Sequence, residues 1–304
     1  MTPDNSAGEI PLPGSMAEGI ALQRYAETML PEGIRILSDP LAIRFINPAI
    51  LQFARDRPAE AKALAEKIEK AMPGWSNAIR LRIRHFDEAA AHAEEEGFTQ
   101  IVSFGAGYDT RPFRIKTLQQ GFRIFEVDRA LTLERKQRIL SEVFGNLPDQ
   151  ITYLPLDMVD RDPWPALVGA GWSKKEKTLF FLEGLVMYLP LATVRGVFAA
   201  IFRNSGKGSS VLFDFVPQFV ADGSTEREGS GNIRAWTIKS GEPILSGFPE
   251  EGTAEFLSGL GYTNICILPS RELADRYFTG QNSGRTVSGL LSIAHADIPG
   301  VGPE

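Results

Sequence analysis

Apolar and polar residues follow a helical period over the first hundred positions of the chain. Apolar residues recur three or four positions apart in residues 16–29, and residues 58–72 are rich in Ala, Glu and Lys. Pro and Gly, which end helices, follow both segments closely. A further helix is predicted over residues 77–96, and Asp39-Pro40 is typical of a helix start.

The period changes at Gln100, where short apolar runs begin to alternate with helical patterns. Strands that alternate with helices predict βαβ units, and therefore an α/β fold with a mostly parallel sheet. The strand-like runs are residues 101–104, 122–127, 152–156, 178–182 and 210–215. The helical patterns between them are residues 111–120, 131–144, 164–168 and 191–202.

A polar, glycine-rich stretch follows Pro217, and we expect residues 216–248 to form a mobile insertion that acts as a lid. The tail then predicts a helix, a strand, a helix and a last strand at residues 249–260, 262–268, 271–277 and 286–294. The predicted organisation is a disordered lead-in over residues 1–15, a helical segment over 16–98 and an α/β core over 99–304.

Composition narrows the class of protein. Of 304 residues, 43% are hydrophobic and 23% charged, which is typical of a soluble globular chain. The net charge of −6 gives no overall attraction to nucleic acid or to an anionic membrane. The first residues lack the basic and apolar parts of a signal peptide, and the single cysteine, Cys266, cannot form an internal disulfide. We therefore expect a cytoplasmic protein.

The first candidate site follows the predicted strand 101–104. Gly105-Ala-Gly107 allows a sharp turn and a close approach of backbone to a ligand, although a plain strand-to-helix turn would show the same pair. The motif differs from the dinucleotide fingerprint, because Thr110 stands where the third glycine would be. A pyrophosphate-bearing cofactor is therefore disfavoured.

Acidic residues end the next predicted strands. Glu126 and Asp128 lie about twenty residues after the glycines, where either carboxylate could accept hydrogen bonds from a ribose. Strand alternation places both side chains on the same face, so the pattern does not separate them. Asp157 and Met158 end the third strand, and Glu183 ends the fourth. Together these positions predict a pocket for an adenosine-bearing cofactor, with S-adenosylmethionine favoured over NAD.

Several motifs resemble the leucine carboxyl methyltransferase-like family, which includes bacterial proteins associated with polyketide O-methylation. The likeness covers residues 16–295 and includes the early segment 21–42. The motifs that carry it are Arg82-Ile-Arg84-His-Phe-Asp87, Gly105-Ala-Gly-Tyr-Asp-Thr-Arg111, Glu126-Val-Asp128 and Glu183-Gly-Leu-Val-Met-Tyr188-Leu-Pro190. The resemblance implies a class I methyltransferase fold: a Rossmann-like, mostly parallel sheet with an antiparallel last strand, N-terminal helices and a lid insertion.

The resemblance also implies a role for each matched residue. Arg82, with Arg80 as the alternative, would pair with the methionyl carboxylate, and Glu183 would hold the amino group. Asp128 would bind the ribose. The full set of expected cofactor-binding residues is Arg82, Gly105, Gly107, Asp128, Asp157, Met158 and Glu183. Tyr108 and Met158 depart from the residues usual in the family at those positions.

Methyl transfer from a sulfonium depends on positioning and desolvation, and a carboxylate acceptor needs no general base. The three histidines form no evident acid–base pair, which favours an acidic acceptor. Arg111 or Arg114 would steer such an anion, and Tyr188 would contact the acceptor; Arg111 and Tyr188 are the candidate catalytic residues. Tyr108 and Trp236 are the candidate substrate-binding residues.

We therefore expect an S-adenosylmethionine-dependent O-methyltransferase that acts on a small-molecule carboxylate or hydroxyl group. The alternatives are a protein C-terminal carboxyl methyltransferase and a non-catalytic S-adenosylmethionine-binding protein. No group of His, Cys and Asp residues has the spacing of a metal site, and no nucleic-acid or membrane partner is expected.

Overall fold

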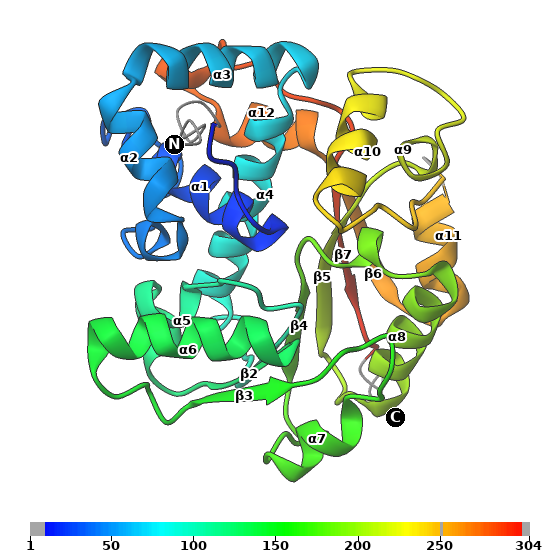
Figure 1. Ribbon diagram of the computed structural model, residues 1–304. Helices are drawn as coiled ribbons and strands as arrows, with labels where there is room; N and C mark the ends of the chain where they lie inside the picture. The colour runs from blue at the N-terminus through cyan, green and yellow to red at the C-terminus, as the bar shows by residue number, and fades with distance from the viewer. Residues whose placement is uncertain (1–9, 250–251, 300–304) are drawn as a thin grey trace, which may run out of the picture.

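The computed structural model describes residues 10–249 and 252–299, and these contain a seven-stranded sheet between layers of helices (Figure 1). The strand order is β3-β2-β1-β4-β5-β7-β6; β1 to β5 are parallel, and β7 runs antiparallel to both of its neighbours. The prediction of a mostly parallel sheet with an antiparallel last strand is confirmed. The strands are β1 Gln100–Phe104, β2 Arg123–Asp128, β3 Ile151–Pro155, β4 Thr178–Leu182, β5 Ser210–Phe215, β6 Thr263–Pro269 and β7 Ser292–Asp297.

The central strands are buried on both faces, as their uninterrupted apolar sequences require. Every residue of β1, β4 and β5 is buried. Val102 of β1 lies between Phe125 of β2 and Phe180 of β4, and all three pack in one apolar cluster. This register brings the carboxyl ends of β1, β2 and β4 to one edge of the sheet.

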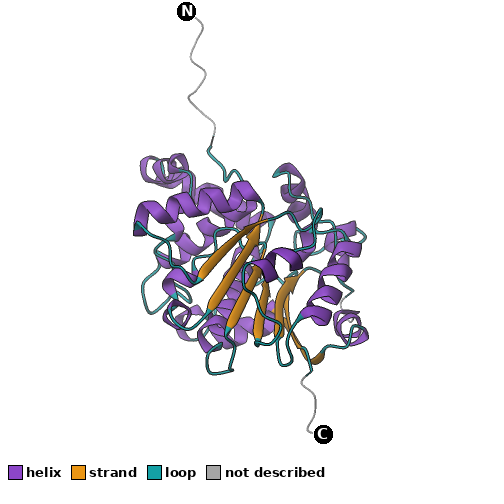
Figure 2. Cartoon of the chain, turned by 90° about the horizontal axis from the view of Figure 1, so that it is seen from below, coloured by secondary structure: helices purple, strands orange, loops and turns teal. Residues whose placement is uncertain are grey.

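Helices cover both faces of the sheet, as Figure 2 shows. Apolar side chains from α7, α8 and α11 pack on one face, and those from α4 and α12 pack on the other. The helices that follow the first strand are α5 Arg111–Arg114, α6 Ala130–Phe144, α7 Trp164–Gly169, α8 Leu191–Asn204, α9 Gln218–Asp222, α10 Ser230–Lys239, α11 Gly252–Gly259 and α12 Ser270–Tyr277.

In the described residues before the first strand, the α-helices are α1 Met16–Thr28, α2 Pro48–Asp56, α3 Pro58–Ala71 and α4 Trp75–His92. The hydroxyl of Ser15 caps α1 by accepting the N–H of Glu18 at 3.2 Å. The buried face of α1 carries charged side chains, and these form ion pairs: Arg24 with Asp39, and Glu27 with Arg285. These ion pairs connect α1 to segments later in the chain. Of the predicted disordered lead-in, residues 1–9 lie outside the described part of the chain.

Some predicted elements differ in the structure. The helix expected over residues 111–120 is split into α5 and a short 3-10 helix at Lys116–Gln119, because Ile115 between them is extended. The segment 216–248, expected to be a loop, contains α9 and α10. Gly223 and Gly229 flank the connection in left-handed conformations, which end α9 and precede α10.

The last strand begins later than predicted, at Ser292, because Leu290 and Leu291 pack against the cluster around Met72 and Ile233 instead of entering the sheet. The helix start predicted at Asp39-Pro40 is a turn before the 3-10 helix Ala42–Phe45. None of the helices in residues 10–249 and 252–299 is long and apolar enough to span a membrane.

Candidate functional site

A cavity of about 350 Å³ lies at the carboxyl ends of β1, β2 and β4. Residues of α1 cover it from one side, and residues 241–245 border it from another. Its volume is at the small end of the range for small-molecule sites. The residues predicted from sequence that line it are Arg82, Gly105, Gly107, Tyr108, Arg111, Asp128, Asp157, Met158, Glu183 and Tyr188.

The glycine turn after β1 forms one wall of the cavity. Gly105 has φ +67°, and a Cβ there would lie 2.9 Å from the Leu185 side chain, which would have to shift. Gly107 has φ +48°, and the nearest side-chain atom to a Cβ there, of Ala17, would be 3.7 Å away. Both positions therefore favour glycine because of their backbone conformation.

The structure distinguishes the two acids of β2. Glu126 is fully buried and pairs with Lys136 of α6 at 2.6 Å, whereas Asp128 lines the cavity. Burial raises the pKa of Glu126 to about 7, although the Lys136 ammonium opposes the shift. The Asp128 carboxylate accepts backbone N–H groups of Gly107 and Arg129, each at 2.7 Å. These bonds fix its orientation at the cavity wall.

Arg82 of α4 reaches the cavity between two acids. Its Nε donates to Oε1 of Glu183 at 3.1 Å, and its Nη1 donates to Oδ2 of Asp214 at 2.8 Å. Its guanidinium lies against Gly184, where a Cβ would come within 3.2 Å of Nη1. Among the described residues, none accepts a hydrogen bond from Nη2 of Arg82. A ligand carboxylate could use that donor.

Arg80, the alternative to Arg82, does not line the cavity. Its Nε lies 3.6 Å from Oε2 of Glu27 in α1. Arg82 is thus the arginine of this pair that faces the cavity.

Arg111, which was expected to steer an anionic acceptor, lines the cavity and is surrounded by carboxylates. Its Nε donates to Asp87 at 2.7 Å, and its Nη1 lies 3.1 Å from Asp109 and 2.7 Å from Oε2 of Glu183. Although burial opposes ionisation, the Arg111 charge lowers the pKa of Asp109. These contacts give Arg111 a second task, which is to orient Glu183.

Arg114 likewise has a structural partner. Its two Nη atoms donate to the two oxygens of Asp87 at 2.7 and 2.6 Å. Such a bidentate pair is fixed in geometry and leaves Arg114 tied to α4. The expectation that Arg114 steers an anion is therefore not supported by its position, while the salt-bridge alternative is.

Of the three aromatic candidate residues, two line the cavity and one does not. Tyr108 lines the cavity, but it is 6% exposed and its ring stacks on Phe45 at 4.8 Å, under α1. Tyr188 lines the cavity, and burial raises the pKa of its hydroxyl, which is therefore protonated at neutral pH. Trp236 of α10 packs in the apolar cluster around Met187 and is not among the residues that line the cavity.

Two residues to which the sequence analysis gave no role hold parts of this site in place. Asp214 of β5 is fully buried, accepts the backbone N–H of Gly184 and pairs with Arg82. Burial raises its pKa, and Arg82 offsets part of that shift. The sequence did contain a signal for Asp214, because an acid inside a continuous apolar strand needs a buried partner.

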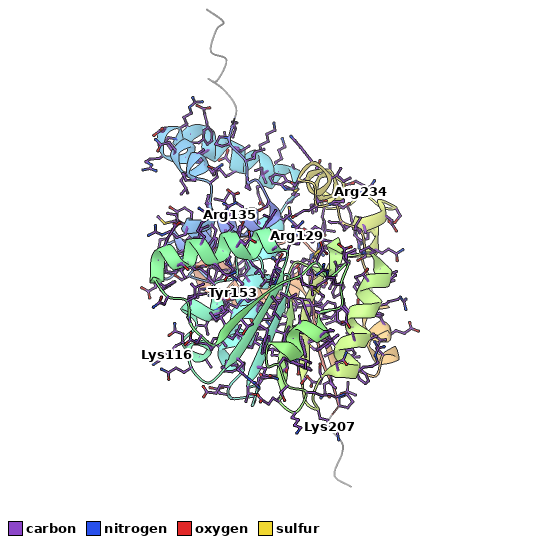
Figure 3. All side chains as sticks on the ribbon, turned by 60° about the horizontal axis from the view of Figure 1, so that its bottom comes forward. Lys116, Arg129, Arg135, Tyr153, Lys207 and Arg234 are labelled. Carbon is purple, nitrogen blue, oxygen red and sulfur yellow. The ribbon has the colours of Figure 1, made fainter. Side chains whose placement is uncertain are left out.

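Glu242 is the second of these residues, and it bridges segments at the cavity mouth. Its Oε2 accepts the backbone N–H of Met16 at 3.3 Å, and its Oε1 lies 3.0 Å from Nη2 of Arg129. Figure 3 labels Arg129 at the start of α6. One carboxylate thus connects α1, the segment 241–245 and α6.

Known proteins are similar to this chain in sequence and in fold. The model of the family described as leucine carboxyl methyltransferase matches residues 17–202, more than half of the chain. The chain belongs to the leucine carboxyl methyltransferase family. Members of this family are methyltransferases that use S-adenosylmethionine, so the expected enzyme class and cofactor are confirmed.

Relatives of this methyltransferase occur in several bacteria. A Mycobacterium avium (strain 104) protein named "Putative S-adenosyl-L-methionine-dependent methyltransferase" is 28% identical over 256 residues, covering 82% of each chain. Bacillus subtilis (strain 168) YktD, given the same description, is 26% identical over 202 residues and 66% of each chain.

Solved structures show the same fold. A DUF574 family protein from Streptomyces avermitilis matches with a TM-score of 0.58 at 14% identity, over 92% of this chain and 97% of its own. A protein from Thermobifida fusca whose structure is titled that of a "putative methyltransferase" matches with a TM-score of 0.57 at 16% identity, over 79% and 88%. At these identities the likeness concerns the fold alone.

The cavity of this methyltransferase suits the cofactor. Gly105 and Gly107 leave backbone exposed, Asp128 presents an oriented carboxylate, and Arg82 has a free donor. Asp157 also lines the cavity, with Oδ1 accepting the N–H of Val159 at 2.9 Å. Within residues 10–249 and 252–299, no three His, Cys, Asp or Glu side chains are placed to hold a metal ion.

Proposed function

We propose that this methyltransferase binds S-adenosylmethionine in the cavity at the carboxyl ends of β1, β2 and β4 and methylates an oxygen atom of a small-molecule acceptor, a carboxylate or a hydroxyl group. One observation carries the proposal: Arg82, Asp128 and Glu183, which come from three elements, all line one cavity beside a glycine turn. Carboxyl ends of parallel strands are where such sheets bind ligands.

Each residue has a chemical task in this proposal. Nη2 of Arg82 donates to the methionyl carboxylate, and Glu183 accepts from the methionyl ammonium while Arg82 and Arg111 hold its two oxygens in place. Asp128 accepts the ribose hydroxyls, with its own orientation fixed by two backbone N–H groups. Asp157 and Met158 lie against the adenine.

The bound cofactor supplies an electrophilic methyl group on a positively charged sulfur. The chain contributes position and exclusion of water. Met16, Ala17 and Ile20 of α1 cover the cavity, and Tyr188 keeps its proton and can donate it in a hydrogen bond to an acceptor oxygen. None of the three histidines lines the cavity, which favours an acceptor that is already ionised, such as a carboxylate.

We further propose that residues 16–98 form a helical cover for the core 99–304, and that the segment 216–248, which contains α9 and α10, serves as a lid. The protein acts in the cytoplasm, a reducing compartment that suits its exposed Cys266.

Isothermal titration calorimetry with S-adenosylmethionine, S-adenosylhomocysteine and NADH tests the cofactor site. We expect heat of binding with the first two and none with NADH, and an at least tenfold affinity loss in Glu183→Ala. Tritium transfer from labelled cofactor to a panel of carboxylates and phenols then tests catalysis. Binding without transfer to any small molecule, or transfer only to peptide C-termini, would overturn the acceptor assignment.

A further inference from the structure

A second cavity of about 770 Å³ lies beside the cofactor cavity, between α8, α9, α11 and the segment 245–249. Figure 1 draws these three helices on the same side of the molecule. The large apolar residues that line it are Leu191, Leu245, Phe248, Phe256 and Leu260. Four polar residues, Arg195, Gln218, Asp222 and Glu255, also line it. No function described so far uses this space, which we call the apolar groove.

The groove and the cofactor cavity are neighbours along two stretches of chain. Leu245 lines both, so the two spaces adjoin at this residue. Leu189 lines the cofactor cavity, and Leu191, two positions later, lines the groove. A molecule that occupies the cofactor cavity beside Leu245 is therefore next to the groove.

Two leucines that line the groove are partly exposed to solvent. Leu245 is 52% exposed and Leu191 is 46% exposed. Exposed apolar side chains that line one groove favour an apolar ligand there. Arg195 borders the same groove, and its guanidinium lies 5.5 Å from the centre of the Phe256 ring.

The volume of the two spaces is compatible with this assignment. A cofactor made of a nucleoside and an amino acid occupies much of a cavity of about 350 Å³. The adjoining groove, of about 770 Å³, offers the acceptor further space.

We propose that the apolar groove binds the hydrocarbon tail of the methyl acceptor, and that the acceptor is an amphipathic carboxylic acid with an acyl chain. This rests on the proposed function. The carboxylate lies beside Tyr188, and the chain crosses Leu245 and covers Leu191. The carboxylate oxygen forms the new bond to the methyl carbon as the carbon–sulfur bond breaks; the electron pair stays on sulfur, and no proton is released.

Calorimetry on the full chain saturated with S-adenosylhomocysteine tests the groove, with sodium decanoate and sodium butyrate as probes. We expect decanoate to bind at least tenfold more tightly than butyrate, because each buried methylene adds affinity. In Leu191→Asp this ratio should fall below threefold. Leu191 is the first residue of α8, where an acid suits the helix N-terminus, so the variant should fold.

Leu131→Asp is the matched control, since Leu131 is 81% exposed in the first turn of α6 and lines neither cavity. It should keep the full decanoate preference. Equal affinity for the two acids, or an unchanged ratio in Leu191→Asp, would overturn the groove assignment even where S-adenosylhomocysteine binds. Failure of S-adenosylhomocysteine to bind would overturn the proposed function itself, so the two failures are distinguishable.

Discussion

Arg82 and Asp214 are 132 positions apart in the sequence, yet Nη1 of Arg82 lies 2.8 Å from Oδ2 of Asp214 in the protein interior. The other oxygen of Asp214 accepts the backbone N–H of Gly184. One buried carboxylate therefore positions both the arginine and the turn that follows β4. Because Asp214 touches neither the cavity nor its contents, we regard it as a positioning residue.

Substitution of Asp214 should affect both the stability of the protein and its affinity for the cofactor. Asp214→Ala leaves Arg82 partly unpaired in the interior, and we expect a loss of about 2–4 kcal/mol in the free energy of unfolding. Cofactor affinity should fall at least tenfold. Asp214→Asn keeps one of the two acceptor oxygens, can accept one of the two hydrogen bonds, and should therefore recover only part of the loss. Urea unfolding and calorimetry measure the two effects; full cofactor affinity in a folded Asp214→Ala would contradict the positioning role.

Gly184 allows the close approach of Arg82. At Gly184 (φ +61°) a Cβ would lie 3.2 Å from Nη1, whereas at Gly97 (φ +79°) it would meet nothing within 4 Å. Gly184→Ala and Gly97→Ala should both lose about 1 kcal/mol of stability from left-handed strain. Only Gly184→Ala should also weaken cofactor binding, by displacing the guanidinium. Equal affinities in the two variants would show that the contact with Arg82 is unimportant.

Alanine substitutions of the two acids of β2 should affect different properties, cofactor binding in one case and stability in the other. Asp128→Ala should weaken cofactor binding by about 1–3 kcal/mol, through the loss of hydrogen bonds to a charged acceptor. Glu126→Ala leaves Lys136 buried without its partner and should cost about 3–5 kcal/mol of stability. Calorimetry and urea unfolding on both variants test the assignment, which fails if Asp128→Ala binds the cofactor normally.

Glu242 should control release from the cavity. Because its contacts with Met16 and Arg129 are partly exposed, they contribute little to stability, about 0–1 kcal/mol. Glu242→Gln should therefore fold normally but release S-adenosylhomocysteine two- to fivefold faster in stopped-flow measurements. Glu226→Gln, also within residues 216–248 but outside the cavity, serves as the control. An unchanged release rate in Glu242→Gln would contradict the bridge.

His85 should make the protein sensitive to acid. Burial and the nearby Arg276 charge lower the pKa of His85 to about 4, from an ordinary value of 6.5. Between these two values the unfolded chain binds a proton that the folded chain does not, so stability falls as pH drops from 6.5 to 4. The loss from this group is about 1–3 kcal/mol after allowance for its partial exposure.

His85→Gln should therefore lose less stability than the wild type between pH 7 and 4.5, as urea unfolding at several pH values would show. His92→Gln, exposed on the same helix, is the control. Parallel stability curves for the wild type and His85→Gln would contradict the lowered pKa.

The sequence by itself determined the order of strands and helices in the core, the glycine turn and the acids at the strand ends. Val102, Phe125 and Phe180 belong to continuous apolar runs that only a sheet buried on both faces can accommodate. Gly105 and Gly107 stand where the backbone turns with positive φ. These features are local, because backbone geometry and hydrophobic period act over a few residues.

Only the tertiary structure decided which charged groups meet. Glu126 and Asp128 have the same side-chain direction along β2, and they differ because α6 covers Glu126 with Lys136 while Asp128 lies beyond that cover. The pairing of Arg82 with Asp214 depends on β5 lying beside β4 in the sheet. Such pairs join residues far apart in the chain, and their energies depend on burial, which no local pattern records.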